Sequence, residues 1–102
     1  MTIPYPRTQL FINGHWREGA TQRALPVHNP ATGHPIGEVA CAEAPDLQEV
    51  AEAAANGFQV WRRISAFERY KIMRKAATLL RDRIELIAQL MTQEQGLSLI
   101  HI

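Results

Sequence analysis

Cys41 is the strongest candidate nucleophile in this sequence of 102 residues. A catalytic thiol needs a positive neighbourhood or an adjacent base, which favours the reactive thiolate. Its sequence neighbours are Ala40, Ala42 and Glu43, none of which meets that need. We therefore interpret Cys41 as a structural residue. Because it is the single cysteine, it also cannot form an internal disulfide, so nothing indicates an oxidising compartment.

The histidines and glycines do not form a ligand site either. No pair of histidines has zinc-ligand spacing with support from a cysteine or a carboxylate. The four histidines are His15, His28, His34 and His101. Residues 33–37 contain two glycines, but these lack the spacing of a phosphate-binding loop and no helix start follows them directly.

Two further groups suggest chemistry at first sight but have simpler explanations. Four carboxylates could act as paired acids and bases, yet they stand at the start of an expected helix over residues 45–62, where the helix dipole and water favour them. These are Glu43, Asp46, Glu49 and Glu52. Phe58 and Trp61 stand three positions apart on that helix, which is more typical of a core aromatic pair than of a ligand platform. No catalytic constellation is therefore predicted.

Short β-strands are expected through the first 42 residues. The expected strands are residues 10–12, 15–17, 24–28 and 35–40. Asn13-Gly14 between bulky apolar residues is typical of a two-residue hairpin turn. Pro30 and Gly33 indicate the second turn, because proline fixes φ and glycine gives freedom at the exit. Residues 1–8 are expected to form an ordered arm or a frayed terminus.

Amphipathic helices are expected from Pro45 onward, and Pro45 suits the first helical position because its missing N–H costs nothing there. Ser65 and Glu68 have the spacing of a capping box that starts a second helix. Its stripe, predicted to be buried, is Ile72, Met73, Ala76, Leu79 and Leu80. A third stripe follows a kink or short break at residues 81–83 and ends at Gly96, a natural C-terminal cap.

The charge of the sequence is nearly balanced. Eleven lysines and arginines against ten aspartates and glutamates give a net charge of +1, so there is no electrostatic reason to expect nucleic acid or an anionic membrane as a partner. The densest basic stretch is Arg69, Lys71, Arg74 and Lys75, which we interpret as a solvated helix face. No apolar run has signal-peptide or membrane-spanning length, so we expect a cytoplasmic protein.

Three stretches resemble the aldehyde dehydrogenase family, in the family's order and with its spacing. They are residues 10–16, similar to the opening INGxW hairpin, residues 27–39, similar to the NPATGxxIGxV segment, and residues 53–61 with 65–96, similar to the paired helices. The Met-Thr-Gln-Glu-Gln-Gly sequence at residues 91–96 resembles succinate-semialdehyde dehydrogenases and their glutarate- and ketoglutarate-semialdehyde relatives. The resemblance covers residues 8–96.

The resemblance implies an enzyme that oxidises an aldehyde, such as succinic semialdehyde, through a cysteine thiohemiacetal and passes hydride to NAD or NADP. In the family, the catalytic cysteine, the glutamate base, the oxyanion-hole asparagine and the cofactor-binding elements lie well beyond position 102. We therefore expect no catalytic, cofactor-binding or metal residue in this chain, and Cys41 inherits no role. The segment is expected to lie as a scaffold against the cofactor-binding domain of a homo-oligomeric parent.

One minor site could involve this chain. Some family members hold a monovalent cation through a carbonyl just before the Asn-Pro turn and a carboxylate near the end of the last helix. By position, the resemblance points to the carbonyl of His28 and the carboxylate of Glu94. A surface carboxylate is the simpler explanation of Glu94, and a remaining ligand would lie downstream.

The expected fold class is an α+β fragment of an α/β aldehyde dehydrogenase fold, with short strands followed by two or three amphipathic helices. Residues 1–96 are the N-terminal part of the family's domain, which is incomplete. Residues 97–102 are an atypical apolar tail where the family continues with Lys-Pro. We interpret this tail as the product of a truncated or mis-joined reading frame.

The alternative function is a free-standing, non-catalytic module that binds a partner through its apolar helix face. Purified residues 1–102 should then be folded and monodisperse, or form one defined complex. Heterogeneous aggregation would instead count against the module and favour a fragment of an enzyme. Circular dichroism combined with size-exclusion chromatography distinguishes these outcomes, and a folded, monodisperse chain would count against the fragment.

Overall fold

The computed structural model describes residues 4–97 and shows four short strands followed by three helices. The strands are β1 (Leu10–Ile12), β2 (His15–Arg17), β3 (Ala24–His28) and β4 (Pro35–Ala40), and the helices are α1 (Ala44–Trp61), α2 (Ala66–Asp82) and α3 (Ile84–Gln95). All four predicted strands are confirmed, and so is the order of strands before helices. Apart from Leu97, the predicted tail lies outside the described residues.

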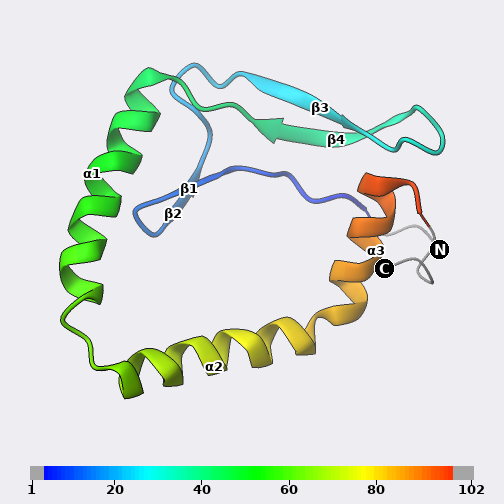
Figure 1. Ribbon diagram of the computed structural model, residues 1–102. Coiled ribbons are helices and arrows are strands. Elements are labelled where there is room, and N and C mark those ends of the chain that lie inside the picture. The colour runs from blue at the N-terminus through cyan, green and yellow to red at the C-terminus, as the bar shows by residue number, and fades with distance from the viewer. Residues whose placement is uncertain (1–3, 98–102) are drawn as a thin grey trace.

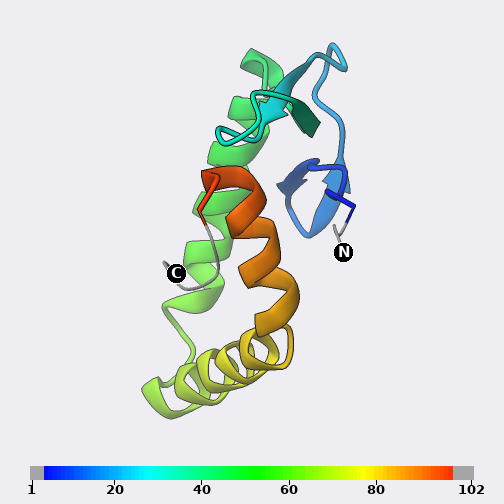
Figure 2. The same ribbon diagram turned by 90° about the vertical axis from the view of Figure 1, so that its right-hand side faces the viewer.

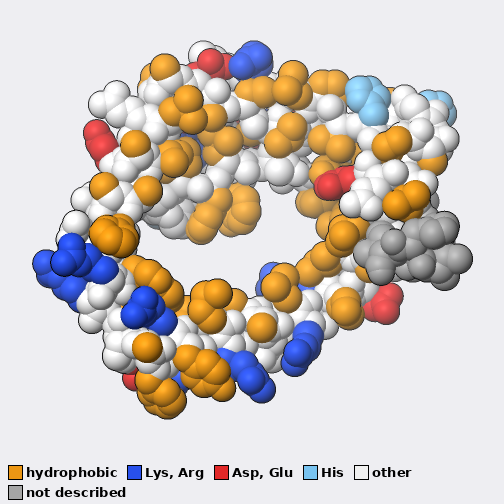
Figure 3. Space-filling view, in the orientation of Figure 1, with side chains coloured by type: hydrophobic (Ala, Val, Ile, Leu, Met, Phe, Trp, Pro, Cys, Tyr) orange, Lys and Arg blue, Asp and Glu red, His pale blue; other side chains and the backbone are white. Residues whose placement is uncertain are grey.

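The elements surround an opening. In Figure 1, α1, α2 and α3 follow one another around three sides of a frame, and the β3–β4 pair closes the fourth. Figure 2 shows the β1–β2 hairpin standing to one side of the helices. In the space-filling view of Figure 3, side chains leave the middle of the frame open. Among the described residues, the buried apolar side chains are Ile12 and Ala40, so the core is very small.

The β1–β2 hairpin forms as its turn residues predict. Asn13 and Gly14 have φ values of 52° and 80°, in the left-handed region that a type I′ turn needs at both positions. The register places Phe11 opposite Trp16, with their ring centroids 4.7 Å apart. Arg17 ends β2, and its side chain reaches the start of α1.

The N-terminal arm runs beside β4, so the ordered arm is confirmed from residue 4 onward. Thr8 forms a parallel bridge with Val39, and its carbonyl accepts a hydrogen bond from the amide of Ala40 at 2.8 Å. The β3–β4 pair itself is antiparallel, with a bulge between Val27 and His28. The arm and β3 therefore cover the two edges of β4.

The turn between β3 and β4 is closed by its own polar groups. The Asn29 carbonyl accepts from the amide of Gly33 at 2.7 Å, and the Asn29 side-chain oxygen accepts from the amide of Ala31 at 2.9 Å. Gly33 has a φ of 74°, so the predicted conformational freedom is used. Gly96, the predicted cap of α3, has a φ of 72° and packs on this turn, where a Cβ would lie 2.8 Å from the nitrogen of Ala31.

The helix boundaries differ slightly from the predictions. Because α1 begins at Ala44, Pro45 occupies the second helical position and not the first. Both positions tolerate a missing N–H, since amides in the first turn have no acceptor within the helix. Ser65 caps α2 by accepting from the amide of Glu68 at 3.2 Å. Arg83, with a φ of −112°, separates α2 from α3 and confirms the short break.

The predicted burial of the α2 stripe and of the aromatic pair on α1 is wrong within the described residues. Ile72, Met73 and Leu80 on α2 keep 50%, 62% and 61% of their surface exposed. Phe58 and Trp61, the predicted core pair on α1, are exposed by 59% and 36%. The periodicity does mark an apolar face on each helix. The hairpin lies beside α1, and Ile87, Ala88 and Met91 on α3 are half-buried, whereas the stripe of α2 is exposed within residues 4–97. In the same part of the chain, no helix is both long enough and apolar enough to cross a bilayer.

Candidate functional site

Cys41 contributes to the fold through its backbone. It follows β4 and is half-buried. Its amide donates to the carbonyl of Arg23 at 2.9 Å, and its carbonyl lies against Gly19, where a Cβ would come within 2.0 Å. Any larger residue at position 19 would collide with that carbonyl, so Gly19 allows the loop before β3 to approach the start of α1. A purely structural role for the Cys41 thiol stays a prediction.

The histidines lie on different elements. His15 is on β2, His28 ends β3 and His34 precedes β4, whereas His101 lies outside the described residues. Residues 33–37 run from the turn directly into β4, so no helix N-terminus follows them. Across residues 4–97, no three His, Cys, Asp or Glu side chains lie close enough together to hold a metal ion.

Asp46 is the most buried side chain in the described part of the molecule, at 1% exposure. Its Oδ1 accepts from Nη1 of Arg17 at 2.7 Å, and its Oδ2 accepts from the amides of Ala20 at 2.9 Å and Glu43 at 2.8 Å. The other end of the Arg17 guanidinium pairs with Glu49 at 2.7 Å. The predicted solvation of the carboxylates is therefore wrong for Asp46, which is removed from water and fully paired.

These donors explain the electrostatics of the Asp46 cluster, which consists of Arg17, Ala20, Glu43, Asp46 and Glu49. The backbone amide of Glu43, then that of Ala20, then the Arg17 side chain lower the pKa of Asp46 from 3.8 to about 2. The same contact with Asp46 raises the pKa of Arg17. This carboxylate is charged near neutral pH and its hydrogen-bond partners all belong to the fold, so we interpret the cluster as a structural anchor.

Part of this anchor is visible in the sequence. An acidic residue at the third position of a helix can accept from the capping amide, as Asp46 does with Glu43. Its pairing with Arg17, 29 positions earlier, has no local sequence pattern. The sequence therefore indicates a capping residue but not a buried ion pair.

A second set of polar contacts fastens the N-terminal arm. Arg7 pairs with Glu18 and with Glu38, each at 2.6 Å. The Tyr5 hydroxyl donates a hydrogen bond to the carboxylate of Glu94, and this contact raises the pKa of Tyr5. The Tyr5 ring lies on Gly37, where a Cβ would come within 2.5 Å of the ring. The arm thus connects β4 to α3.

These contacts bear on the cation site suggested for His28 and Glu94. The packing of Gly96 on Ala31 brings the end of α3 beside the turn that follows His28. One carboxylate oxygen of Glu94 is already bonded to Tyr5. The cation site stays a prediction.

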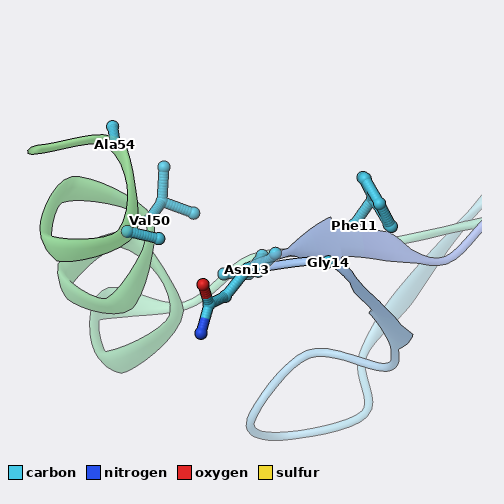
Figure 4. A pocket seen from close by; sticks show the side chains of 7 residues that line it. Phe11, Asn13, Gly14, Val50 and Ala54 are labelled. Carbon is cyan, nitrogen blue, oxygen red and sulfur yellow. The ribbon is translucent and has the colours of Figure 1, made fainter. Parts of the chain in front are cut away.

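An open hollow of 540 Å³ lies between the β1–β2 turn and α1. Figure 4 shows the turn residues Asn13 and Gly14 beside Val50 on α1, with Ala54 further along the helix. The lining is mainly apolar, and Asn13 supplies its polar side chain. A shallow site with one neutral polar group offers neither a nucleophile nor a general base.

The basic stretch of α2 is solvated at three of its four positions. Lys71, Arg74 and Lys75 are exposed as predicted. Arg69 is only partly exposed, and its Nε is buried. The interpretation as a solvated face is therefore wrong for Arg69, which lies on a different side of the helix.

The geometry of the described residues does not identify a function, but comparison with known proteins identifies the family of the chain. The family model described as "Aldehyde dehydrogenase family" matches residues 16–102. The chain belongs to the aldehyde dehydrogenase family. The predicted family of the chain is thereby confirmed.

This aldehyde dehydrogenase segment is similar to proteins much longer than itself. It is 40% identical over 98 residues to 4-(hydroxymethyl)benzenesulfonate dehydrogenase TsaD1 of Comamonas testosteroni, covering 96% of this chain and 21% of that protein. The crystal structure of succinate-semialdehyde dehydrogenase from Burkholderia pseudomallei matches with 32% identity and a TM-score of 0.86, covering 92% of this chain and 20% of that one. An NADP-dependent enzyme of E. coli matches with 35% identity, a TM-score of 0.87 and the same coverage. The chain spans about a fifth of the length of the curated relatives it matches.

Asp46→Asn should destabilise the segment at neutral pH, because the neutral amide weakens the bond to Arg17 and presents an NH2 group to donors. With the folded pKa at about 2 and the unfolded pKa at 3.8, the carboxylate's contribution to stability is complete above about pH 4 and is lost as pH falls from there to about 2. Urea unfolding of residues 1–96 joined to the downstream part of the Burkholderia enzyme, followed by circular dichroism, should show a steeper acid dependence in the wild type than in the variant. Glu52→Gln, at an exposed carboxylate on the same helix, is the control. Equal effects of the two substitutions would contradict the anchor role.

Proposed function

We propose that this chain is the N-terminal scaffold segment of an NAD(P)-dependent semialdehyde dehydrogenase, and that it carries none of the catalytic residues. The parent enzyme oxidises an aldehyde such as succinic semialdehyde to the carboxylic acid, with NAD or NADP as hydride acceptor. The observation that carries the proposal is the match to the Burkholderia succinate-semialdehyde dehydrogenase, in which 92% of this chain corresponds to 20% of that chain.

The packing of the segment supports a scaffold role. The polar contacts around Asp46 and Arg7 are satisfied within the described residues, whereas the apolar stripe of α2 is exposed. Fully burying one Leu, Ile or Met side chain contributes about 1.5–3 kcal/mol. The rest of a dehydrogenase could supply that burial. The alternative, a free-standing module, would need a core of its own, and Ile12 with Ala40 is too little for one.

The substrate proposal rests on two observations. The sequence at residues 91–96 resembles the succinate-semialdehyde branch, and one matched structure is a succinate-semialdehyde dehydrogenase. The Comamonas relative is named for 4-(hydroxymethyl)benzenesulfonate, so membership of the family does not by itself select the aldehyde. We further propose a cytoplasmic, homo-oligomeric parent, without nucleic acid or membrane as partner, whose cofactor contacts lie outside this segment.

A chimera tests the scaffold role. Residues 1–96 of this chain, joined to the downstream part of the Burkholderia enzyme, should form NADH or NADPH only when succinic semialdehyde is added. The isolated chain should form none under the same conditions. Cys41→Ala in the chimera should leave the rate unchanged, because this thiol is not the nucleophile.

Absorbance at 340 nm gives the rate, and size-exclusion chromatography shows whether the chimera is folded and assembled. An aggregated or inactive chimera would contradict the proposal that this segment replaces its counterpart. Loss of activity in Cys41→Ala would contradict the assignment of all catalytic residues to the downstream part.

A further inference from the structure

The side of α2 opposite its apolar stripe carries a line of basic side chains. The spacing of the helix places four exposed cations on this side, and we call them the basic stripe. They are Lys71, Arg74, Lys75 and Arg81. Figure 3 shows lysine and arginine side chains over α2, along the outer border of the frame.

The charges of the basic stripe are mostly uncompensated within the segment. The arginines that precede α1 each bind at least one carboxylate; they are Arg7, Arg17 and Arg23. Within residues 4–97, only Lys71 of the stripe has an ion pair, with Glu68 at 3.0 Å. Residues 62–83 contain eight lysines and arginines against two acidic residues, so they carry a charge of +6, whereas the whole chain carries +1. Such a local excess of one sign attracts an anionic partner.

Two aromatic rings stand at the N-terminal end of the basic stripe. Phe67 and Tyr70 are both more than half exposed, and their ring centroids lie 6.2 Å apart in a stacked arrangement. The Lys71 ammonium lies over the Phe67 ring, 5.2 Å from its centroid. Aromatic residues and arginine are enriched in protein interfaces, where rings provide apolar anchors. This side of α2 therefore combines an apolar anchor with a row of cations.

We propose that the basic stripe and the Phe67–Tyr70 pair bind an acidic helix of a partner protein. The stripe follows a helix of 17 residues, so its complement is a second helix with carboxylates every three or four positions. An apolar side chain at the end of that helix would pack on the aromatic pair. This inference goes beyond the proposed function, since it concerns the side of α2 opposite the apolar stripe.

Separate carboxylates fit this surface better than a continuous polyanion does. Asp82 directly follows Arg81 at one end of the stripe, and Glu68 precedes Lys71 by three positions at the other. A phosphate backbone carries a charge at every nucleotide, so it would meet repulsion at both ends. A peptide can place neutral residues opposite these two carboxylates. A bilayer would take up the apolar side of the helix, which is not the side that carries the stripe.

The probe is a labelled synthetic helical peptide with glutamates at helical spacing and a leucine at each end. Fluorescence anisotropy measures its binding to the 102-residue chain and to the chimera with the Burkholderia downstream part. Both proteins should bind the peptide, and the affinity should fall as salt is added, because exposed charges are screened. A peptide with lysine at each glutamate position should not bind, which controls for contacts with exposed apolar side chains.

Charge reversal tests the stripe directly. The triple variant Lys71→Glu, Arg74→Glu and Lys75→Glu should bind the glutamate peptide at least about tenfold more weakly, since attraction becomes repulsion. The lysine peptide should bind this variant. The rate of NADH or NADPH formation and the unfolding midpoint of the chimera should stay nearly unchanged. Arg74→Glu alone should weaken binding more than Arg63→Glu, an exposed control residue outside α2.

Several results would overturn the inference. One is a wild-type protein that binds the glutamate peptide no better than the lysine peptide. Another is a chimera that unfolds when Arg74 alone is reversed, because the enzyme itself would then cover the stripe. Tighter binding of a single-stranded oligonucleotide or of phosphatidylserine vesicles would assign this side of α2 to a different partner. A wild-type chimera that does not fold would contradict the proposed function, and the 102-residue chain then decides this inference.

Discussion

The buried carboxylate of Asp46 determines the direction in which the helices leave the strands. It binds Arg17 at the end of β2, the amide of Ala20 in the following loop and the amide of Glu43 at the cap of α1. A buried charge is costly unless it is paired and hydrogen-bonded, so these three donors must converge for α1 to begin where it does. Because α2 and α3 follow α1 around the frame, their positions depend on this anchor (Figure 1).

The frame is closed at its other end by the N-terminal arm. Arg7 holds the arm to Glu18 and Glu38, and Tyr5 crosses Gly37 to bond with Glu94 on α3. Polar contacts thus tie the start of α1 to the β1–β2 hairpin and the end of α3 to the arm, while the apolar stripe of α2 stays exposed. Such a segment determines a shape but gains little burial by itself, which is the arrangement expected of a scaffold that a larger enzyme completes.

The local parts of this fold could be predicted from sequence. The turns and helix caps are specified locally, by the φ values and hydrogen bonds of Asn13-Gly14, the Asn29–Gly33 turn, Ser65 and Gly96. Their prediction therefore does not depend on distant parts of the chain. The ion pair of Asp46 with Arg17 could not be predicted, because only the three-dimensional fold brings the two side chains together. Sequence periodicity marks which side of α2 is apolar, but it does not show what covers that side. The exposure of Phe58 and Trp61 on α1 likewise could not be predicted, because burial depends on which atoms pack against a side chain.

Amide hydrogen exchange, measured in the isolated chain in dilute solution and in the chimera, is the most direct test. It distinguishes the start of α1, which contacts within this segment hold in place, from α2, which the rest of an enzyme would cover. The amides of Ala20 and Glu43, bonded to Asp46, should exchange more slowly than those of α2 in the isolated chain. The amides of α2 should exchange rapidly there and become protected in the chimera. Equal protection of α2 in both would contradict the account, since the helix would then be stabilised without any covering chain.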